Sequence, residues 1–81
     1  MTFSQALVLL KTESARVARA GWNGRGVWIE LVRSECWSTQ TMGITARHLP
    51  WIGMKTADDC FVPWLASQTD ILADDWVEVG R

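Results

Sequence analysis

The first apolar residues of the chain recur with the spacing of one helical face. Thr2 and Gln5 stand three positions apart, as in a capping box, where each side chain binds a backbone N–H that the first helical turn leaves free. The apolar positions, at i, i+3, i+4 and i+7, are Phe3, Ala6, Leu7 and Leu10. The stripe ends at the polar pair Lys11-Thr12. This pattern predicts an N-terminal helix with one face toward a core.

Farther along, apolar residues alternate with polar ones or form short runs, as in β-strands. The stretches of this kind are 15–19, 27–32, 50–55, 60–65 and 76–79. The four residues 56–59, between two of the apolar runs, have the length of a hairpin turn. Pro63 lacks a backbone donor, which places its strand at an edge of the sheet or interrupts the strand there.

Three connections complete the pattern. Residues 21–26 contain three glycines and an Asn-Gly pair, which is a strong turn signal. Residues 34–48 are polar without a clear period and are expected to form a long connection, a candidate pocket rim. Ser67 and Asp70 have the spacing that begins a short helix. The whole chain, 1–81, is therefore predicted as one α+β domain: an N-terminal helix packed on a small, mostly antiparallel sheet, with a short second helix before the last strand.

The chain has 81 residues, enough for one hydrophobic core. Folding at this size hides about 63% of the unfolded surface, so a partner subunit would help. The longest apolar runs, 6–10 and 61–66, have five and six residues, whereas a membrane span needs about twenty. We therefore expect no membrane partner. No basic segment precedes an apolar stretch at the start, and no secretory signal is expected either.

The charge is unevenly divided. Residues 1–55 carry seven bases and three acids, net +4, and residues 56–81 carry six acids and one base, net −5. A protein that binds DNA or RNA usually has a basic stripe and a high pI, whereas the pI here is near 5.7. We expect no nucleic-acid partner. The asymmetry fits self-association or a small anion held by the basic half, and it fits a solvated acidic face equally well.

The sequence gives little support for a metal site or for a catalytic site. Cys36 and Cys60 lie 24 residues apart, and with the single histidine, His48, they cannot supply the usual four ligands of structural zinc. We expect two reduced thiols and no cofactor. Adjacent residues point apart in a helix or strand, so neither Asp58-Asp59 nor Asp74-Asp75 makes a catalytic dyad. His48 has no evident partner for acid–base work, and we do not expect an enzyme.

Six tryptophans and no tyrosine are the unusual part of the composition. With two phenylalanines, six indoles require roughly 1,200–2,000 Å² of cover. So small a domain would struggle to hide that much apolar surface. We expect some of the rings at a subunit interface or in a pocket, with core packing as the alternative for each.

Three blocks of sequence stand out beside the opening helix. They are Ala18–Gly24 (ARAGWNG), Met54–Asp58 (MKTAD) and the ungapped fifteen residues Val62–Trp76 (VPWLASQTDILADDW). In this order they resemble the phage Thoeris anti-defence family of the second type, and the resemblance extends from about Phe3 to Val79. The chain departs from the family pattern at Asp59-Cys60, where the family usually has a glycine after the aspartate.

The resemblance implies a sponge. Such a protein is a small homotetramer that holds immune signalling nucleotides in the cytoplasm of the infected bacterial host and keeps them from their effector without degrading them. The signals are glycocyclic ADP-ribose isomers made by TIR-domain proteins, and some relatives also take up cyclic oligonucleotides. Two alternatives stay open: a protein-interaction or structural module of a phage that binds no nucleotide, and a phosphodiesterase that degrades the signal.

The same resemblance gives a set of candidate ligand-binding residues. They are Trp22, Asn23, Gly24, Arg25, Trp28, Lys55, Trp64, Ser67, Gln68, Thr69 and Asp70. Trp22, together with either Trp64 or Trp28, would wall the base or ribose, and the lysine and arginine would neutralise the pyrophosphate. The asparagine and the glycine backbone, including Gly26, would donate to phosphate or ribose as an anion-binding nest, with a tight hairpin as the alternative. Residues 67–70 would bind ribose hydroxyls or the adenine edge, with helix capping as the alternative for Ser67 and Asp70.

Overall fold

The computed structural model describes residues 1–33, 38–41, 44–47 and 49–80. Its elements in chain order are α1 (Phe3–Thr12), β1 (Arg16–Arg19), α2 (Ala20–Asn23), β2 (Trp28–Val32), β3 (Ser38–Thr41), β4 (Ile44–Arg47), β5 (Trp51–Lys55), β6 (Phe61–Pro63), α3 (Gln68–Leu72) and β7 (Trp76–Gly80). The N-terminal helix, the antiparallel sheet and the short helix before the last strand confirm the predicted α+β class.

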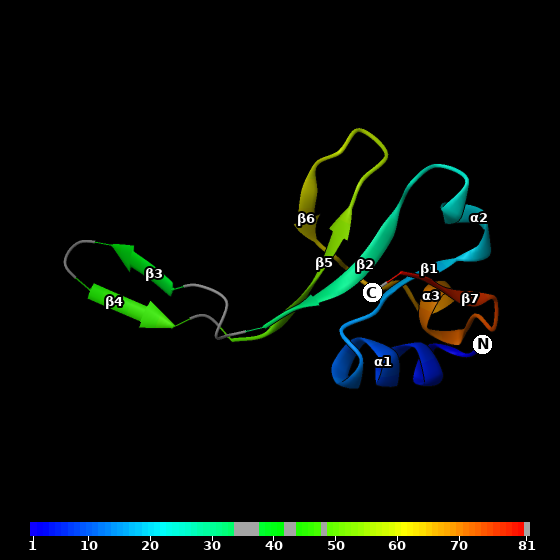
Figure 1. Cartoon of the computed structure of the whole chain (residues 1–81), viewed down its shortest axis with the longest axis horizontal. Helices are drawn as coiled ribbons and strands as arrows, with labels where there is room; N and C mark the ends of the chain where they lie inside the picture. The colour runs from blue at the N-terminus through cyan, green and yellow to red at the C-terminus, as the bar shows by residue number, and fades with distance from the viewer. Residues whose placement is uncertain (34–37, 42–43, 48, 81) are drawn as a thin grey trace.

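Five strands form the main sheet, in the order β6-β5-β2-β1-β7, and every neighbouring pair is antiparallel (Figure 1). The edge strand β6 ends at Pro63, as the missing donor of proline predicted. The turn between β5 and β6 also follows the prediction: the Thr56 N–H donates to the Cys60 carbonyl at 2.8 Å. Asp59 closes that turn with a φ of 65°, in the left-handed region.

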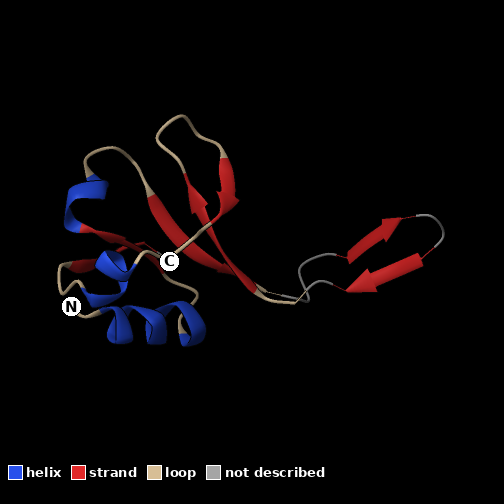
Figure 2. Cartoon of the chain, turned by 180° about the vertical axis from the view of Figure 1, so that it is seen from behind, coloured by secondary structure: helices blue, strands red, loops and turns tan. Residues whose placement is uncertain are grey.

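Helix α1 covers one face of the sheet through the predicted apolar stripe. The capping box is present, because Thr2 Oγ1 accepts from the Gln5 N–H at 3.3 Å and Gln5 Oε1 accepts from the Thr2 N–H at 2.9 Å. The fully buried core cluster consists of Ala6, Leu10, Val17, Ile29 and Trp76. All three helices gather at the end of the sheet that contains β1 and β7 (Figure 2). We call the side that carries this cluster the helix-covered face.

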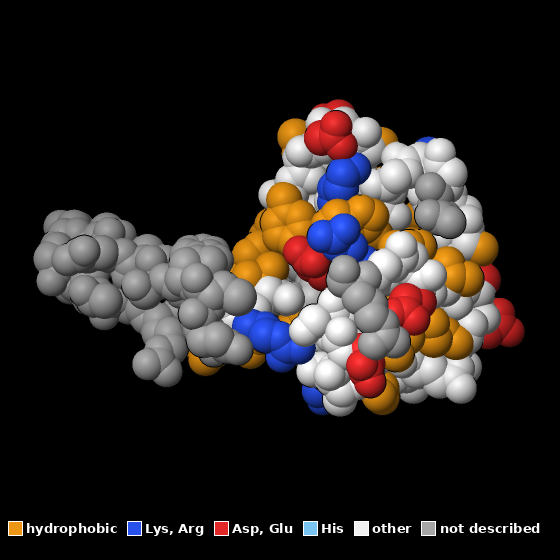
Figure 3. Space-filling view, viewed as in Figure 1, with side chains coloured by type: hydrophobic (Ala, Val, Ile, Leu, Met, Phe, Trp, Pro, Cys, Tyr) orange, Lys and Arg blue, Asp and Glu red, His pale blue; other side chains and the backbone are white. Residues whose placement is uncertain are grey.

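The opposite side, which we call the open face, carries Trp28, Trp51 and Phe61, because side chains alternate along each strand. The ring of Phe61 lies 6.4 Å from that of Trp28 and 5.8 Å from that of Trp51, measured between centroids. Arg16 places its guanidinium carbon 4.5 Å from the centroid of Trp28. The space-filling view shows hydrophobic side chains with charged ones among them over β2, β5 and β6 (Figure 3). The rings pack on one another and remain partly exposed.

Gly53 makes room for this packing. A Cβ at Gly53 would stand 2.3 Å from a ring atom of Phe61 and 3.0 Å from one of Trp51. Such an approach is far closer than van der Waals contact, so the absent side chain lets Phe61 lie over β5. The fit of the open face therefore depends on a glycine within a strand.

Residues 34–48 correct the prediction of a connection without regular structure. Within them β3 and β4 pair antiparallel as a separate two-stranded sheet, from Ser38 opposite Arg47 to Thr41 opposite Ile44. The sequence of β3 is polar throughout, so it lacks the apolar–polar alternation that reveals a half-buried strand. Threonine nevertheless favours extended backbone. Positions 34–37, 42–43 and 48 lie outside the described residues, and with them lie Cys36, Trp37 and His48.

The glycine-rich segment is also more than the turn that was predicted. It begins with the single helical turn α2, and the chain reverses only afterwards, where the Arg25 N–H donates to the Trp22 carbonyl at 2.9 Å. Gly26 has a φ of 70°, which explains the glycine at this position. The helical turn matters because it sets the direction of the Trp22 side chain.

Candidate functional site

A pocket of about 480 Å³ opens beside the core cluster. It lies between the turn that follows α2, strand β5 and the segment that leads from β6 into α3. The lining residues are Trp22, Arg25, Val27, Met54, Pro63, Trp64, Leu65 and Asp70. The volume lies within the roughly 300–1,000 Å³ of small-molecule sites, and mostly apolar walls with a few polar groups are typical of them.

Two tryptophans form a wall that is fixed from behind. Trp76 is fully buried, and the rings of Trp22 and Trp64 stand edge-on to it, with centroids 5.3 and 5.8 Å away and interplanar angles of 79° and 84°. Trp22 and Trp64 also meet edge to face, at 6.4 Å and 76°. Edge-to-face pairs are the favoured aromatic geometry. The two lining rings are thus held by a third, and the wall exists before any ligand arrives.

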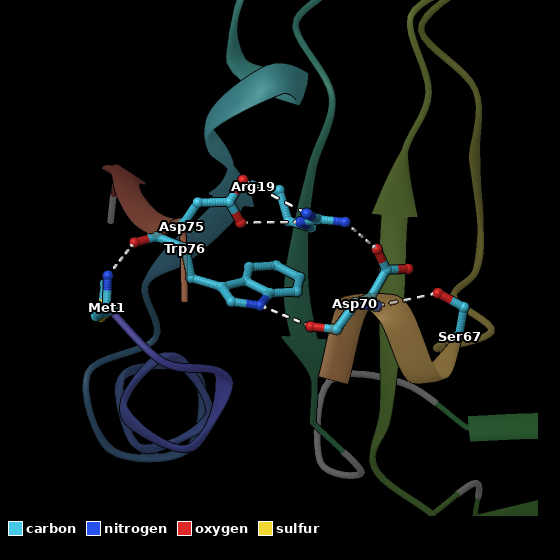
Figure 4. A network of polar contacts seen from close by, with 6 residues as sticks. All are labelled: Met1, Arg19, Ser67, Asp70, Asp75 and Trp76. Atoms are coloured by element: carbon cyan, nitrogen blue, oxygen red, sulfur yellow. Dashed lines mark hydrogen bonds and ion pairs between the residues drawn. The ribbon is translucent and has the colours of Figure 1, made fainter. Parts of the chain in front are cut away.

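Asp70 reaches the pocket from a short helix that is anchored on three sides (Figure 4). Its backbone N–H donates to Ser67 Oγ, the N-cap of α3, at 3.1 Å. Its carbonyl accepts from the indole N–H of Trp76 at 2.9 Å, and its carboxylate Oδ1 accepts from Arg19 Nη1 at 3.0 Å. The position of Asp70 is therefore fixed by its cap, by the core and by β1.

Arg19 joins Asp70 to a second carboxylate. Its Nε donates to Asp75 Oδ1 at 2.9 Å, while its Nη1 holds Asp70 (Figure 4). The hydrogen bond from Arg19 to Asp75 favours the ionised form of that carboxyl group, and it lowers the pKa of Asp75 below its ordinary value. The bonds to both acids raise the pKa of Arg19. The guanidinium of Arg19 thus offsets one of the two negative charges of Asp70 and Asp75.

The remaining charged group on the lining is Arg25. It is exposed, and no hydrogen bond or ion pair among the described residues engages its side chain. Arg19 pairs with both Asp70 and Asp75 and offsets one of their two negative charges. Among the described lining residues, the cationic group that an anion could contact is the guanidinium of Arg25.

The structure brings four of the predicted binding residues together in this pocket: Trp22, Arg25, Trp64 and Asp70. It places Trp28 and Lys55 on the open face instead, opposite each other in β2 and β5. The ammonium of Lys55 donates to the Gly26 carbonyl at 2.9 Å and pairs with Asp59 at 2.8 Å, so it ties the glycine turn to the hairpin.

Four of the other predicted residues are not among the described residues that line the pocket. Ser67 caps α3, as its alternative interpretation had it, and Gln68 and Thr69 are exposed on the first turn of that helix. Gly24 is the C-cap of α2, and the side chain of Asn23 lies outside what the structure describes.

Sequence reasoning missed the non-aromatic apolar residues of the lining, which are Val27, Met54, Pro63 and Leu65. Two of these belong to the same ungapped block as Trp64 and Asp70, and that block was the available signal. Met54 is placed by register, because it stands opposite the buried Ile29 and so turns toward the helix-covered face. No local pattern reveals such a pairing.

The described residues contain no group of three or more His, Cys, Asp or Glu side chains placed to hold a metal ion. None of the helices in the described part of the chain has the length and hydropathy to cross a bilayer.

Comparison with known proteins agrees with the resemblance read from the three sequence blocks. A family model described as a Thoeris anti-defense 2-like domain matches residues 1–79. Among curated proteins, Thoeris anti-defense 2 of Bacillus phage SP01 is 35% identical over 82 residues, an alignment that covers 94% of this chain and 91% of the relative.

Proposed function

The chain belongs to the Thoeris anti-defense 2 family, and from this premise we propose that it counters Thoeris defence as a phage sponge. It binds cyclic nucleotide immune signals, namely glycocyclic ADP-ribose isomers and cyclic oligonucleotides, and keeps them from their effector in the host cytoplasm. Membership of this family and the similarity to Thoeris anti-defense 2 of Bacillus phage SP01 support the anti-defence role. The sequestration mechanism is supported by the chemistry of the pocket.

The observation that carries the mechanism is the combination of groups on one lining: two indoles, a guanidinium that no described residue engages, and a carboxylate held by an arginine. A cyclic nucleotide offers a base, a phosphate and ribose hydroxyls. Stacking a base on an aromatic ring contributes about 1–3 kcal/mol, and a charge-assisted hydrogen bond about 1.5–3 kcal/mol. To hold a signal that is present below micromolar concentration, the binding free energy must be roughly −8 to −12 kcal/mol. One exposed ring cannot supply that, whereas these groups acting together can.

The captured signal is proposed to leave the pocket chemically intact. Hydrolysis of a pyrophosphate or glycosidic bond requires groups that stabilise charge developing in the transition state. Indole walls and one arginine bind the ground state, and uniform binding does not lower the chemical barrier. Incubation with a cyclic ADP-ribose isomer, removal of free ligand, heat denaturation and chromatography of the supernatant test this. ADP-ribose or AMP that accumulates with time would identify an enzyme.

The protein is further proposed to work as a homotetramer in which a second copy completes the pocket wall. Leu65 lines the pocket and yet is 90% exposed, so that side of the pocket stands open in a single chain. Nearby on α3, Ile71 and Leu72 are also exposed. Large apolar side chains clustered beside a site favour a protein neighbour. Light scattering at micromolar concentration measures the assembly, and a stable single-chain species would contradict it.

The alternative is an interaction or structural module that binds no nucleotide. The open face favours it specifically, because Trp28, Trp51 and Phe61 form a packed aromatic cluster that remains partly exposed. Aromatic residues are enriched at protein interfaces. On this alternative the pocket would stay empty in the presence of every cyclic nucleotide.

Thermal shift with a panel of cyclic ADP-ribose isomers and cyclic oligonucleotides separates the two functions. A ligand at one hundred times its Kd adds about 2.7 kcal/mol to stability, which a melting curve resolves. The variants Trp22→Ala and Asp70→Ala should fold and bind more weakly, because they remove a wall and a hydrogen-bond acceptor. The matched control is Trp28→Ala, whose ring lies on the open face. An unchanged melting temperature of the native protein with every ligand would favour the interaction module.

A further inference from the structure

We propose that Arg19 is a positioning residue of the pocket, although it does not line it. On this inference, which rests on the proposed nucleotide-binding function, Arg19 fixes the orientation of the Asp70 carboxylate and offsets part of its charge. The pocket can then offer a hydrogen-bond acceptor to its ligand and repel an anion less than an unpaired carboxylate would. This acceptor and the guanidinium of Arg25, which has no partner among the described residues, together select a ligand that carries both a phosphate and an O–H or N–H donor.

The geometry of Arg19 is that of a clamp between two segments. Its Nη1 holds Asp70 in α3 at 3.0 Å and its Nε holds Asp75, just before β7, at 2.9 Å. The side chains of Arg19 and Asp70 are only 24% and 17% exposed, so water competes weakly for these bonds. Arg19 lies in β1, next to the core, and its backbone is fixed by the strand pairing with Trp76. A rigid strand thus determines where the carboxylate of a short helix points.

Arg19 binds one carboxylate oxygen of Asp70 and does not contact the other. The contact of Arg19 with Asp70 is to Oδ1, and the described residues provide no hydrogen bond to Oδ2. The carboxylate lies on the pocket lining. An ionised carboxylate only accepts hydrogen bonds, so Oδ2 is suited to a hydroxyl or an amine and not to a phosphate oxygen.

Charge explains why the clamp is needed. Without Arg19, Asp70 and Asp75 would be two unpaired carboxylates beside a site that depends on one cation, Arg25. Two unpaired negative charges beside the pocket would repel each other and would repel an anion bound in it. The pairing therefore allows an acid and an anion to share the same pocket.

Four variants test the inference, with one glycocyclic ADP-ribose isomer as the probe in calorimetric titrations of the full chain. Arg19→Gln removes the guanidinium, and Asp70→Asn keeps the acceptor oxygen without its charge. The double variant Arg19→Gln/Asp70→Asn removes both charges. Arg16→Gln is the matched control, because Arg16 is in the same strand but lies over Trp28 on the open face.

We expect Arg19→Gln to weaken binding about tenfold to a hundredfold, the range for loss of one charge-assisted hydrogen bond. The double variant should bind more tightly than Arg19→Gln and within a few-fold of Asp70→Asn, because no unpaired charge remains at position 70. A residue that only supported the fold would give no such rescue. The control Arg16→Gln should bind like the native protein.

Two results would overturn the inference: native affinity in Arg19→Gln, or a double variant as weak as Arg19→Gln while its circular dichroism spectrum is native. If Arg19→Gln does not fold, the comparison of Arg19→Lys with the native protein decides. Lysine keeps the charge but has no fork to hold both acids, so an intermediate affinity is expected and an unchanged one contradicts the clamp. A native protein that binds no probe would instead overturn the proposed function, and this inference with it.

Discussion

The two faces of the sheet use the same kinds of side chain for different ends. On the helix-covered face, Trp76 is fully buried and holds Trp22 and Trp64 edge-on at the pocket. On the open face, Trp28 and Trp51 pack around Phe61 and remain partly exposed. The difference arises from strand parity and from which side the helices cover, not from residue type. A count of tryptophans therefore says little about function until each ring is assigned to a face.

The arginines at the two ends of β1 show the same division. Arg19 is held by two carboxylates beside the pocket, whereas Arg16 lies over the ring of Trp28 and pairs with Glu30 at 3.5 Å. The first is fixed by hydrogen bonds of 2.9 and 3.0 Å to two carboxylates. The second is a longer, half-exposed pair that water can replace. We expect substitutions on the two faces to differ in size accordingly.

Trp76→Ala should have the largest effect. Removing a fully buried indole from the core leaves a cavity, and substitutions of this kind cost about 3–5 kcal/mol. That is a large share of the roughly 5–15 kcal/mol that stabilises a domain. Urea unfolding followed by circular dichroism measures the loss. Trp28→Ala, on the open face, is the comparison, and equal losses at the two positions would remove the distinction between the faces.

Gly53→Ala tests the packing of the open face itself. The added methyl group would collide with the ring of Phe61, which must turn away from β5. Overpacking of this kind costs about 1–3 kcal/mol. Gly21→Ala is the control, since its Cβ would meet no atom within 4 Å and alanine favours helix α2. Equal melting temperatures for the two variants would mean that Phe61 is not held over the strand.

Acid should weaken the Arg19 cluster selectively. The pKa of Asp75 is lower in the folded chain than its ordinary 3.8, because Arg19 hydrogen-bonds the ionised form. Such a group contributes stability above its unfolded pKa, and the contribution is lost as pH falls through the lower folded value. Asp75→Asn should therefore reduce stability at pH 7 and flatten the loss of stability below about pH 4. The control is the exposed neighbour variant Asp74→Asn, whose free energy of unfolding in urea at pH 7 should stay within about 0.5 kcal/mol of the native value.

Glu30→Gln should have the smallest effect. It removes the exposed partner of Arg16 on the open face, and surface pairs of this kind contribute about 0.2–1 kcal/mol. The cation–π contact of Arg16 with Trp28 stays in place. A loss above that range in urea unfolding would show that the open face is ordered by charge as much as by its aromatic packing.

Local signals carried much of the fold. The capping box of Thr2 and Gln5, the Ser67 cap and the Thr56–Asp59 turn each depend on residues a few positions apart, and each is present. The hairpin of β3 and β4 was not predicted, because a polar strand has no apolar periodicity by which to recognise it.

The candidate site was predictable only in part, for a related reason. Trp22, Trp64 and Asp70 came from sequence blocks that resemble the family, whereas Arg19 meets Asp70 and Asp75 across separations of 51 and 56 residues. Which face Trp28 would occupy likewise depended on the placement of the helices. Contacts between distant segments follow from register and packing, and no short pattern encodes them.

The place of Trp76 in the chain has a consequence for synthesis. The indole around which the core closes belongs to β7, the last strand, and β7 pairs with β1, near the beginning. A nascent chain that has exposed α1 and β1 but not yet residue 76 lacks the ring on which Trp22 and Trp64 rest. Pairing over so long a separation is slow relative to local structure, because the loop between the strands must close first. Chain growth therefore reaches β7 before the pocket can form, and ribosome-bound intermediates should gain neither protease resistance nor ligand until that strand has emerged.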